Sequence, residues 1–139
     1  DYDTVLIDCP PSLSAVTINA MTAANAVLVP LQCEFLALEG LSQLLRTVDL
    51  VRTALNPELE IQGVVLTMFD KRNRLSGLVA DDVRGYFGDK VYNTVIPRNV
   101  RLAEAPSYGL PGVAYDRSSK GAQAYLAFGA EMIERIATL

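Results

Sequence analysis

The residues Asp8-Cys9-Pro10-Pro11 could do chemistry, because they place a carboxylate at the end of the apolar run Val5-Leu6-Ile7. An aspartate at the carboxyl end of a parallel strand can hold Mg²⁺ directly or through water, since this ion prefers oxygen ligands and keeps several waters. The two prolines fix the backbone and remove two N–H donors, so a stiff, switch-like segment is expected after the strand. Taken alone, the same residues would equally suit an aspartate that caps a turn.

The loop that would hold the phosphates of a nucleotide is not found in the sequence. The pattern G-x-x-x-x-G-K-[ST] requires a Gly-Lys pair, and the 139 residues contain none. Because phosphoryl transfer depends on that loop and its lysine to cradle the phosphates, hydrolysis by this chain alone is not expected. The sequence starts at Asp1, just before the apolar run, and we expect a preceding part of the same domain.

Apolar runs alternate with helical patterns along the chain. Strands are predicted at residues 5–7, 26–31, 61–69 and 91–96, and helices at residues 38–55, around 78–87 and at 122–136, with Ser118 or Ser119 as the N-cap of the last. Aromatic side chains on these helices are expected to pack against the sheet: Tyr86, Phe87, Tyr125 and Phe128. This order predicts an α/β fold with a doubly wound, mostly parallel sheet that is incomplete at its amino-terminal side.

Charge is distributed unevenly within a net charge of −4. Residues 1–70 hold two basic and nine acidic side chains, whereas residues 71–120 hold nine basic and five acidic ones. The basic residues follow successive predicted strands or precede the last helix: Lys71, Arg72, Arg74, Arg98, Arg101, Arg117 and Lys120. If those strands are neighbours, the cations share one edge and could contact phosphates without reading sequence. The alternative is a solvated rim in which one arginine serves a nucleotide.

Cysteine and histidine usage excludes an ordinary zinc site. Cys9 and Cys33 lack C-x-x-C spacing and the chain contains no histidine, so two reduced thiols are expected. The sequence also contains no run of 18 apolar residues that could span a membrane.

Five ordered motifs cover essentially the whole chain. They are Asp-Cys-Pro-Pro-Ser-Leu at 8–13, Val-Pro-Leu-Gln-Cys-Glu-Phe-Leu-Ala-Leu-Glu-Gly-Leu at 29–41, Leu-Thr-Met-Phe-Asp at 66–70, Ile-Pro-Arg-Asn-Val-Arg-Leu-Ala-Glu-Ala-Pro-Ser at 96–107 and Tyr-Asp-Arg-Ser-Ser-Lys-Gly-Ala at 115–122. Together they resemble the ParA family of DNA-partitioning ATPases, with the chromosomal branch favoured. The resemblance implies a P-loop NTPase-like fold, with residues 1–139 as the carboxyl-terminal part of a single nucleotide-binding domain.

The resemblance also implies roles for individual residues. Asp8 corresponds to the Walker B-type carboxylate that positions Mg²⁺ around ATP, and Pro10 and Pro11 correspond to the switch that follows. Met68, Pro97, Arg98 and Asn99 occupy the positions that form the family's adenine pocket. Glu34 lies in a loop that, in related ATPases, approaches the nucleotide near the dimer interface. The family's binding to DNA falls on the basic positions Arg72, Arg74, Arg98, Arg101, Arg117 and Lys120.

The function implied is that of a cytoplasmic, nucleoid-associated ATPase that segregates or positions a chromosome or plasmid. It would dimerise with ATP, bind double-stranded DNA non-specifically and work with a ParB-type centromere-binding protein, without a membrane. Three alternatives remain. A membrane-associated relative that places the division site would need a basic amphipathic tail, and residues 131–139 lean acidic. An iron–sulfur reductase relative would need cluster-ligating thiols from each subunit, and a non-catalytic α/β interaction domain would need neither metal nor nucleotide.

Overall fold

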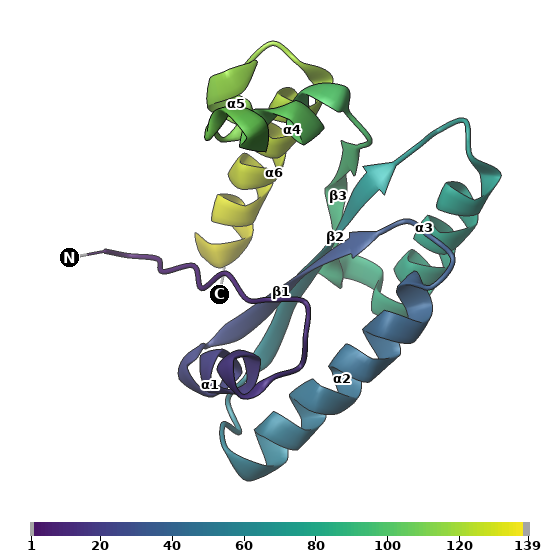
Figure 1. Ribbon diagram of the computed structural model, residues 1–139. Coiled ribbons are helices and arrows are strands. Elements are labelled where there is room, and N and C mark those ends of the chain that lie inside the picture. Colours follow the sequence, from purple (N-terminus) through teal and green to yellow (C-terminus); the bar gives the residue numbers. More distant parts are fainter. Residues whose placement is uncertain (1, 138–139) are drawn as a thin grey trace.

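The computed structural model describes residues 2–137 as a three-stranded parallel sheet with helices on both faces (Figure 1). The elements in chain order are α1 (Ala15–Ala23), β1 (Ala26–Gln32), α2 (Ala37–Ala54), β2 (Glu60–Phe69), α3 (Arg74–Phe87), η1 (Gly88–Lys90), β3 (Val91–Pro97), α4 (Val100–Glu104), η2 (Ala105–Tyr108), α5 (Gly112–Tyr115) and α6 (Lys120–Ala137). The strand order is β1-β2-β3, and both pairs are parallel. The predicted α/β class and the last three predicted strands are confirmed.

Side chains of the central strand β2 alternate between two cores. Val64 and Leu66 are fully buried in the core that α2 and α3 cover, whereas Val65 faces the opposite core. That second core contains Tyr92 and Ile96 of β3, and α6 packs on it. In Figure 1 the sheet accordingly lies between the yellow α6 on one side and the blue and teal α2 and α3 on the other. Period-two alternation along a strand covered on both faces produces this three-layer arrangement.

Close contact between β2 and β3 depends on a glycine. A Cβ at Gly63 would lie 2.6 Å from the Tyr92 ring and 2.8 Å from the Lys90 carbonyl oxygen. The Tyr92 hydroxyl donates to Gln62 at 2.7 Å, which satisfies the one polar atom of this buried ring. Tyr92 also packs edge-on against Phe128 of α6, at a centroid distance of 4.8 Å.

The strand predicted at residues 5–7 is wrong. Residues 4–10 have no regular secondary structure, and among the described residues they pair with no strand. Val5 is 74% exposed and Leu6 is 73% exposed. Figure 1 shows this purple segment passing in front of the sheet rather than within it. A strand requires a partner for its N–H and C=O groups, and apolar composition alone does not supply one.

Other helix expectations are met in part. Ser119 caps α6, because its hydroxyl oxygen accepts the Ala122 N–H at 3.2 Å. Phe87 and Phe128 pack on the cores as predicted, but Tyr86 and Tyr125 are 76% and 42% exposed. Helix α1 was not predicted, because its apolar side chains are spread around the helix rather than gathered on one face.

Candidate functional site at the carboxyl edge of the sheet

The carboxyl ends of the three strands are joined by backbone hydrogen bonds. The Cys33 N–H after β1 donates to the Thr67 carbonyl at 3.2 Å, and the Arg98 N–H after β3 donates to the Phe69 carbonyl at 3.0 Å. The hydroxyl of Ser76, in the first turn of α3, donates to the Cys33 carbonyl at 3.3 Å. These bonds bring residues 33–34, 67–70 and 97–99 together at one edge, where ligands of parallel sheets gather.

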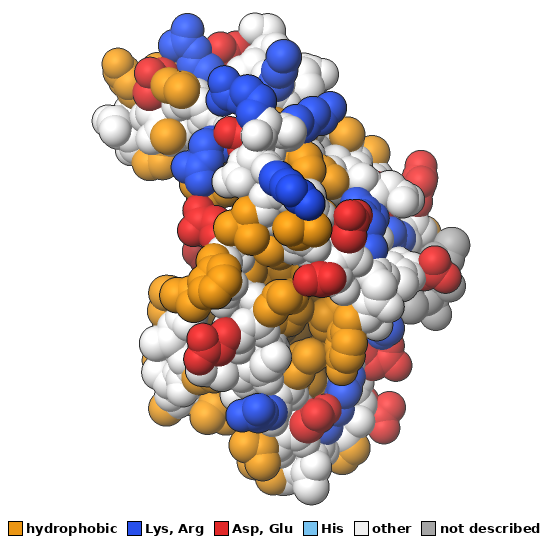
Figure 2. Space-filling model, turned by 90° about the vertical axis from the view of Figure 1, so that its right-hand side faces the viewer, with side chains coloured by type: hydrophobic (Ala, Val, Ile, Leu, Met, Phe, Trp, Pro, Cys, Tyr) orange, Lys and Arg blue, Asp and Glu red, His pale blue; other side chains and the backbone are white. Residues whose placement is uncertain are grey.

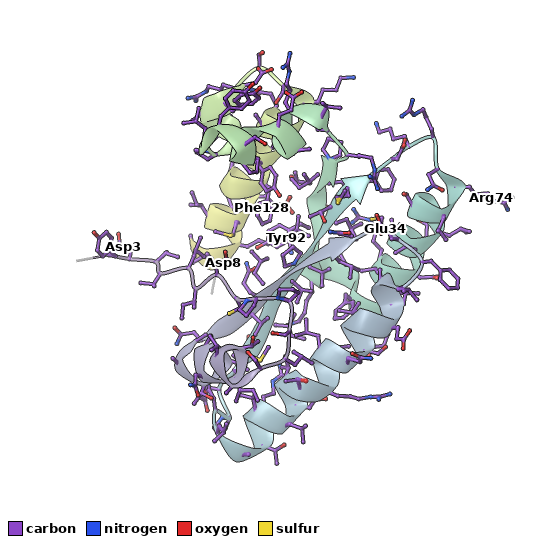
Figure 3. The ribbon with its side chains drawn as sticks, viewed as in Figure 1. Asp3, Asp8, Glu34, Arg74, Tyr92 and Phe128 are labelled. Carbon is purple, nitrogen blue, oxygen red and sulfur yellow. The ribbon has the colours of Figure 1, made fainter. Side chains whose placement is uncertain are left out.

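An ion pair crosses the end of the central strand. Arg98 Nη2 lies 3.1 Å from Glu34 Oε1, and both side chains are 54% exposed. The pair links a residue after β1 to one after β3, with β2 between them. Figure 3 shows Glu34 at the tip of β1. The structure therefore joins two predicted site residues that are 64 positions apart in the sequence.

The other residues predicted for an adenine pocket lie at the same edge. Met68, near the end of β2, has a positive φ of 50° and is half-buried. A non-glycine residue in this region is strained and often marks a functional position. Pro97 is half-buried at the end of β3, whereas the Asn99 side chain caps α4 by accepting the Leu102 N–H at 3.3 Å.

A tight turn after β2 carries part of the basic cluster. Asp70 accepts the backbone N–H of Arg72 at 2.9 Å and pairs with its guanidinium at 3.3 Å. These hydrogen bonds, led by the one from the backbone, lower the pKa of Asp70. Arg74 begins α3, and Figure 3 shows its side chain pointing away from the sheet.

Asp8, Pro10 and Pro11 are exposed and belong to the irregular amino-terminal segment. Figure 3 shows Asp8 on the amino-terminal segment to the left of β1, away from Glu34 at the tip of that strand. A groove of about 1870 Å³, mostly apolar, separates this segment from β1 and α2. Within residues 2–137 the structure brings no group of three His, Cys, Asp or Glu residues together that could hold a metal ion. The structure does not assemble Asp8 with the edge residues.

Residues 97–120, which we call the cap, form a compact unit over the start of α6. Arg101 pairs with Glu104 at 3.2 Å and with Asp116 at 3.3 Å. Glu104 raises the pKa of Arg101, while the hydroxyl of Ser118 lowers the pKa of Asp116 against a smaller opposing effect of burial. Glu104 also accepts the Tyr115 hydroxyl at 3.2 Å. One predicted DNA-binding arginine is therefore held by two carboxylates of its own fold.

Lys and Arg side chains gather in the upper half of the face shown in Figure 2, at the height of the cap. Three of the predicted DNA-binding cations are ion-paired: Arg72, Arg98 and Arg101. The other basic side chains of this cluster form no ion pair within the described part of the chain: Lys71, Arg74, Arg117 and Lys120. The expected basic edge exists, but intramolecular carboxylates neutralise nearly half of it.

The remaining sequence expectations concern cysteines and membranes. Cys9 is exposed and Cys33 is 2% exposed, and both are free thiols. Burial raises the pKa of the Cys33 thiol, with a smaller opposing effect from Arg84. Across residues 2–137, the structure contains no helix both long and apolar enough to cross a membrane.

Two features of the structure have no counterpart among the predicted site residues. Tyr108 and Tyr115 stack on each other in the cap, at a centroid distance of 5.0 Å. Glu131 of α6 accepts the backbone N–H groups of Asn93 and Thr94 in β3, at 2.8 and 2.9 Å. Their only sequence signals are a tyrosine on each side of the Gly-Leu-Pro-Gly stretch and an acid with an arginine four residues later in the last predicted helix.

Comparison with solved structures defines the class of the fold. The chain matches cobyrinic acid a,c-diamide synthase from Mycobacterium smegmatis with bound ATP analog and magnesium, with a TM-score of 0.71 and 41% identity over 89% of this chain and 45% of that one. It matches the cell division ATPase MinD of Pyrococcus furiosus with a TM-score of 0.68 and 27% identity, over 99% of this chain and 52% of that one. The fold is that of a P-loop NTPase-like α/β domain, of which the chain forms part.

Sequence relatives define the family. A family model described as an AAA domain matches residues 1–61. The chain is 66% identical over 134 residues to the chromosome partitioning protein ParA of Caulobacter vibrioides, covering 96% of this chain and 50% of that protein. It is 58% identical over 132 residues to the sporulation initiation inhibitor protein Soj of Bacillus subtilis, covering 95% and 52%. The chain belongs to the ParA/Soj family and spans about half the length of the curated relatives it matches.

Proposed function

We propose that the native polypeptide carrying this chain is a Mg²⁺-dependent ATPase that segregates or positions a chromosome or plasmid. It would act as an ATP-bound homodimer on double-stranded DNA, in the cytoplasm at the nucleoid, with a ParB-type centromere-binding protein stimulating hydrolysis. The observation that carries this proposal is the 66% identity, along almost the whole chain, to a chromosome partitioning protein.

The carboxyl edge supports nucleotide binding. Half-buried Met68 and Pro97 offer apolar surface to an adenine, and Arg98 offers a cation beside them. The side chain of Asn99 caps α4, so it would hold this wall in place rather than contact the base directly.

Asp8 would hold the metal. Its carboxylate makes no hydrogen bond or ion pair with the described residues, and a single free carboxylate suits Mg²⁺, which takes its remaining oxygens from water and phosphate. The ion, when bound, neutralises charge on the phosphates. Pro10 and Pro11 would keep the backbone beside Asp8 stiff, because each proline fixes φ near −65°.

The unpaired cations support DNA binding. Arg117 and Lys120 flank the start of α6 in the cap, and Lys71 and Arg74 flank the start of α3. Such residues attract the phosphate backbone without reading bases, so affinity should fall steeply with salt. Arg101 is a poorer test of this role, since its removal would also leave Glu104 and Asp116 unpaired at the same surface.

The test uses the native polypeptide with a random-sequence duplex, ATP and Mg²⁺. Asp8→Ala should abolish ATP hydrolysis, because the metal loses its protein ligand. The double variant Arg117→Ala, Lys120→Ala should retain ATP binding but lose roughly tenfold in duplex affinity, and the slope of log K against log salt should fall by about two. Lys90→Ala serves as the matched control, because Lys90 donates to the Ile61 carbonyl at the opposite end of the sheet.

Two results would contradict the proposal. Undiminished hydrolysis by Asp8→Ala would remove Asp8 from the metal site. Equal loss of ATP and duplex binding in the double variant would mean that Arg117 and Lys120 support the fold rather than contact DNA.

A further inference from the structure

One aromatic ring in the cap is presented to solvent. Tyr108, the last residue of η2, is 67% exposed, although an aromatic side chain is ordinarily half-buried or more. Its ring stacks on that of Tyr115 at a centroid distance of 5.0 Å and an interplanar angle of 26°. One face of the Tyr108 ring is therefore occupied, and much of the rest of the side chain contacts solvent.

The supporting ring is fixed by a polar chain. The Tyr115 hydroxyl donates to Glu104 at 3.2 Å, and Glu104 is paired with Arg101. Partial burial and this carboxylate raise the pKa of Tyr115, so its hydroxyl stays protonated as a donor at neutral pH. A ring held in this way presents its neighbour with little loss of conformational entropy on binding.

The helices of the cap are also packed closely against one another. The Leu102 side chain inserts where Gly112 of α5 and Gly121 of α6 approach it, and a Cβ at either glycine would come within 2.4 or 2.5 Å of it. The elements α4, α5 and α6 of the cap are therefore packed closely together, with Tyr108 between α4 and α5 in the chain.

The charge around Tyr108 decides which ligand fits. Both carboxylates of the cap, Glu104 and Asp116, are paired with Arg101. Arg117 and Lys120 are exposed, and neither forms an ion pair with another described residue. The exposed ring therefore belongs to a cap whose unpaired charges, Arg117 and Lys120, are both positive, and such a cap repels a basic peptide. It suits a polyanion that carries flat aromatic faces, which is a nucleic acid.

We infer that Tyr108, with Arg117 and Lys120, forms a contact for unpaired nucleotides. The ring stacks on an exposed base while the two cations bind the phosphates on either side. In an intact duplex the bases stack on one another, so their faces are not offered to Tyr108 and the ring adds little there. The inference rests on the proposed DNA binding and adds a preference for unpaired segments.

The test compares two probes with the native polypeptide in ATP and Mg²⁺: a fluorescein-labelled 30-nucleotide thymidine strand and a random-sequence 30-base-pair duplex. Tyr108→Ala should weaken the single-strand complex roughly tenfold, the range of one lost stacking contact. Its duplex affinity should change less than twofold, and its salt dependence should match the wild type. Tyr108→Phe, which keeps the ring, should bind both probes as the wild type does.

A matched control is available on another element. Tyr86 of α3 is 76% exposed, but Asp82 lies one helical turn before it, so Tyr86→Ala should leave both affinities unchanged. If Tyr108→Ala does not fold, Tyr108→Leu, which keeps apolar bulk without the aromatic face, should show the same selective loss.

Four results would overturn the inference. They are no binding of the single strand by the wild type, equal weakening of both complexes in Tyr108→Ala, a loss in Tyr108→Phe as large as in Tyr108→Ala, and a Tyr108-dependent complex with a nona-lysine peptide instead of the oligonucleotide. If the duplex is still bound in any of these cases, the proposed function stands. If the wild type binds only the single strand, duplex binding is refuted and the contact for unpaired nucleotides is supported.

Discussion

Two apolar runs that each end in aspartate adopt opposite structures in this chain. Residues 64–69 form the carboxyl-terminal part of β2, and Val64 and Leu66 have no exposed surface. Residues 5–7 lie outside the sheet, where Ile7 is 53% exposed and Val5 and Leu6 are more exposed still. The difference shows that an apolar run becomes a strand only where a neighbouring strand pairs with it: β2 pairs with both β1 and β3, whereas residues 5–7 pair with no described strand.

The two aspartates that follow these runs differ in the same way. Asp70 is committed to the turn, since Arg72 supplies a backbone and a side-chain hydrogen bond that lower its pKa. Asp8 forms no hydrogen bond or ion pair with the described residues, so its carboxylate takes no part in holding the fold. An aspartate after an apolar run therefore stabilises a turn at Asp70, whereas the carboxylate of Asp8 has no partner among the described residues.

The largest expected effect comes from removing a leucine side chain from each of the two apolar runs, residues 64–69 and residues 5–7, and comparing the loss of stability. Leu66→Ala should lower the free energy of unfolding by about 3 kcal/mol, because it opens a cavity in a closed core. The same change at exposed Leu6 should cost less than about 0.5 kcal/mol. Urea unfolding followed by circular dichroism measures both, and a comparable loss in Leu6→Ala would show that residues 5–7 are packed after all.

A second prediction concerns the backbone N–H groups of the edge strand β3. A side chain of α6 accepts two of them, whereas residues 5–7 have no such partner among the described residues. Glu131 accepts two strand N–H groups and pairs with Arg135 at 2.9 Å. Burial alone would raise the pKa of Glu131, but the hydrogen bonds from Asn93, Thr94 and Arg135 outweigh it and lower the pKa. Glu131→Gln should therefore cost about 2 kcal/mol at neutral pH.

The pH dependence of Glu131→Gln gives a second readout. A carboxylate whose pKa is lowered by folding contributes stability above its unfolded pKa, near 4.5, and loses that contribution as pH falls through the folded value. The difference in unfolding free energy between wild type and Glu131→Gln should shrink as the pH is lowered below 4.5. A constant difference across this range would show that the charge of Glu131 does not stabilise β3.

The smallest expected effect concerns the carboxyl edge of the sheet, from which Asp8 lies apart. Glu34→Gln removes a half-exposed ion pair, so stability should change by less than about 0.5 kcal/mol. Because Arg98 is released, duplex affinity of the native polypeptide should rise about twofold at moderate salt. Fluorescence anisotropy measures this, with Asp49→Asn, which frees Arg52 on α2, as a charge-matched control. A decrease in affinity would mean that Glu34 positions Arg98 for DNA.

The sequence predicted the secondary-structure elements better than the side-chain contacts between them. Three strands, the parallel order and the Ser119 cap follow from apolar runs and capping chemistry, which act over a few residues. The positive φ of Met68 and the Tyr108–Tyr115 stack could not be predicted, because each depends on neighbours brought in from elsewhere in the fold. The basic edge was predicted as a charge cluster, but the pairing of Arg98 and Arg101 with carboxylates was not.

The sequence by itself determined the class of fold, the family and the set of candidate residues, since composition, periodicity and motif order are local properties of the chain. The tertiary structure decided which candidates meet. It joined Glu34 to Arg98, paired Arg101 with two carboxylates and left residues 5–8 outside the sheet. The physical reason is that pairing, burial and charge neutralisation depend on distances between residues far apart in sequence, which are set only when the chain folds.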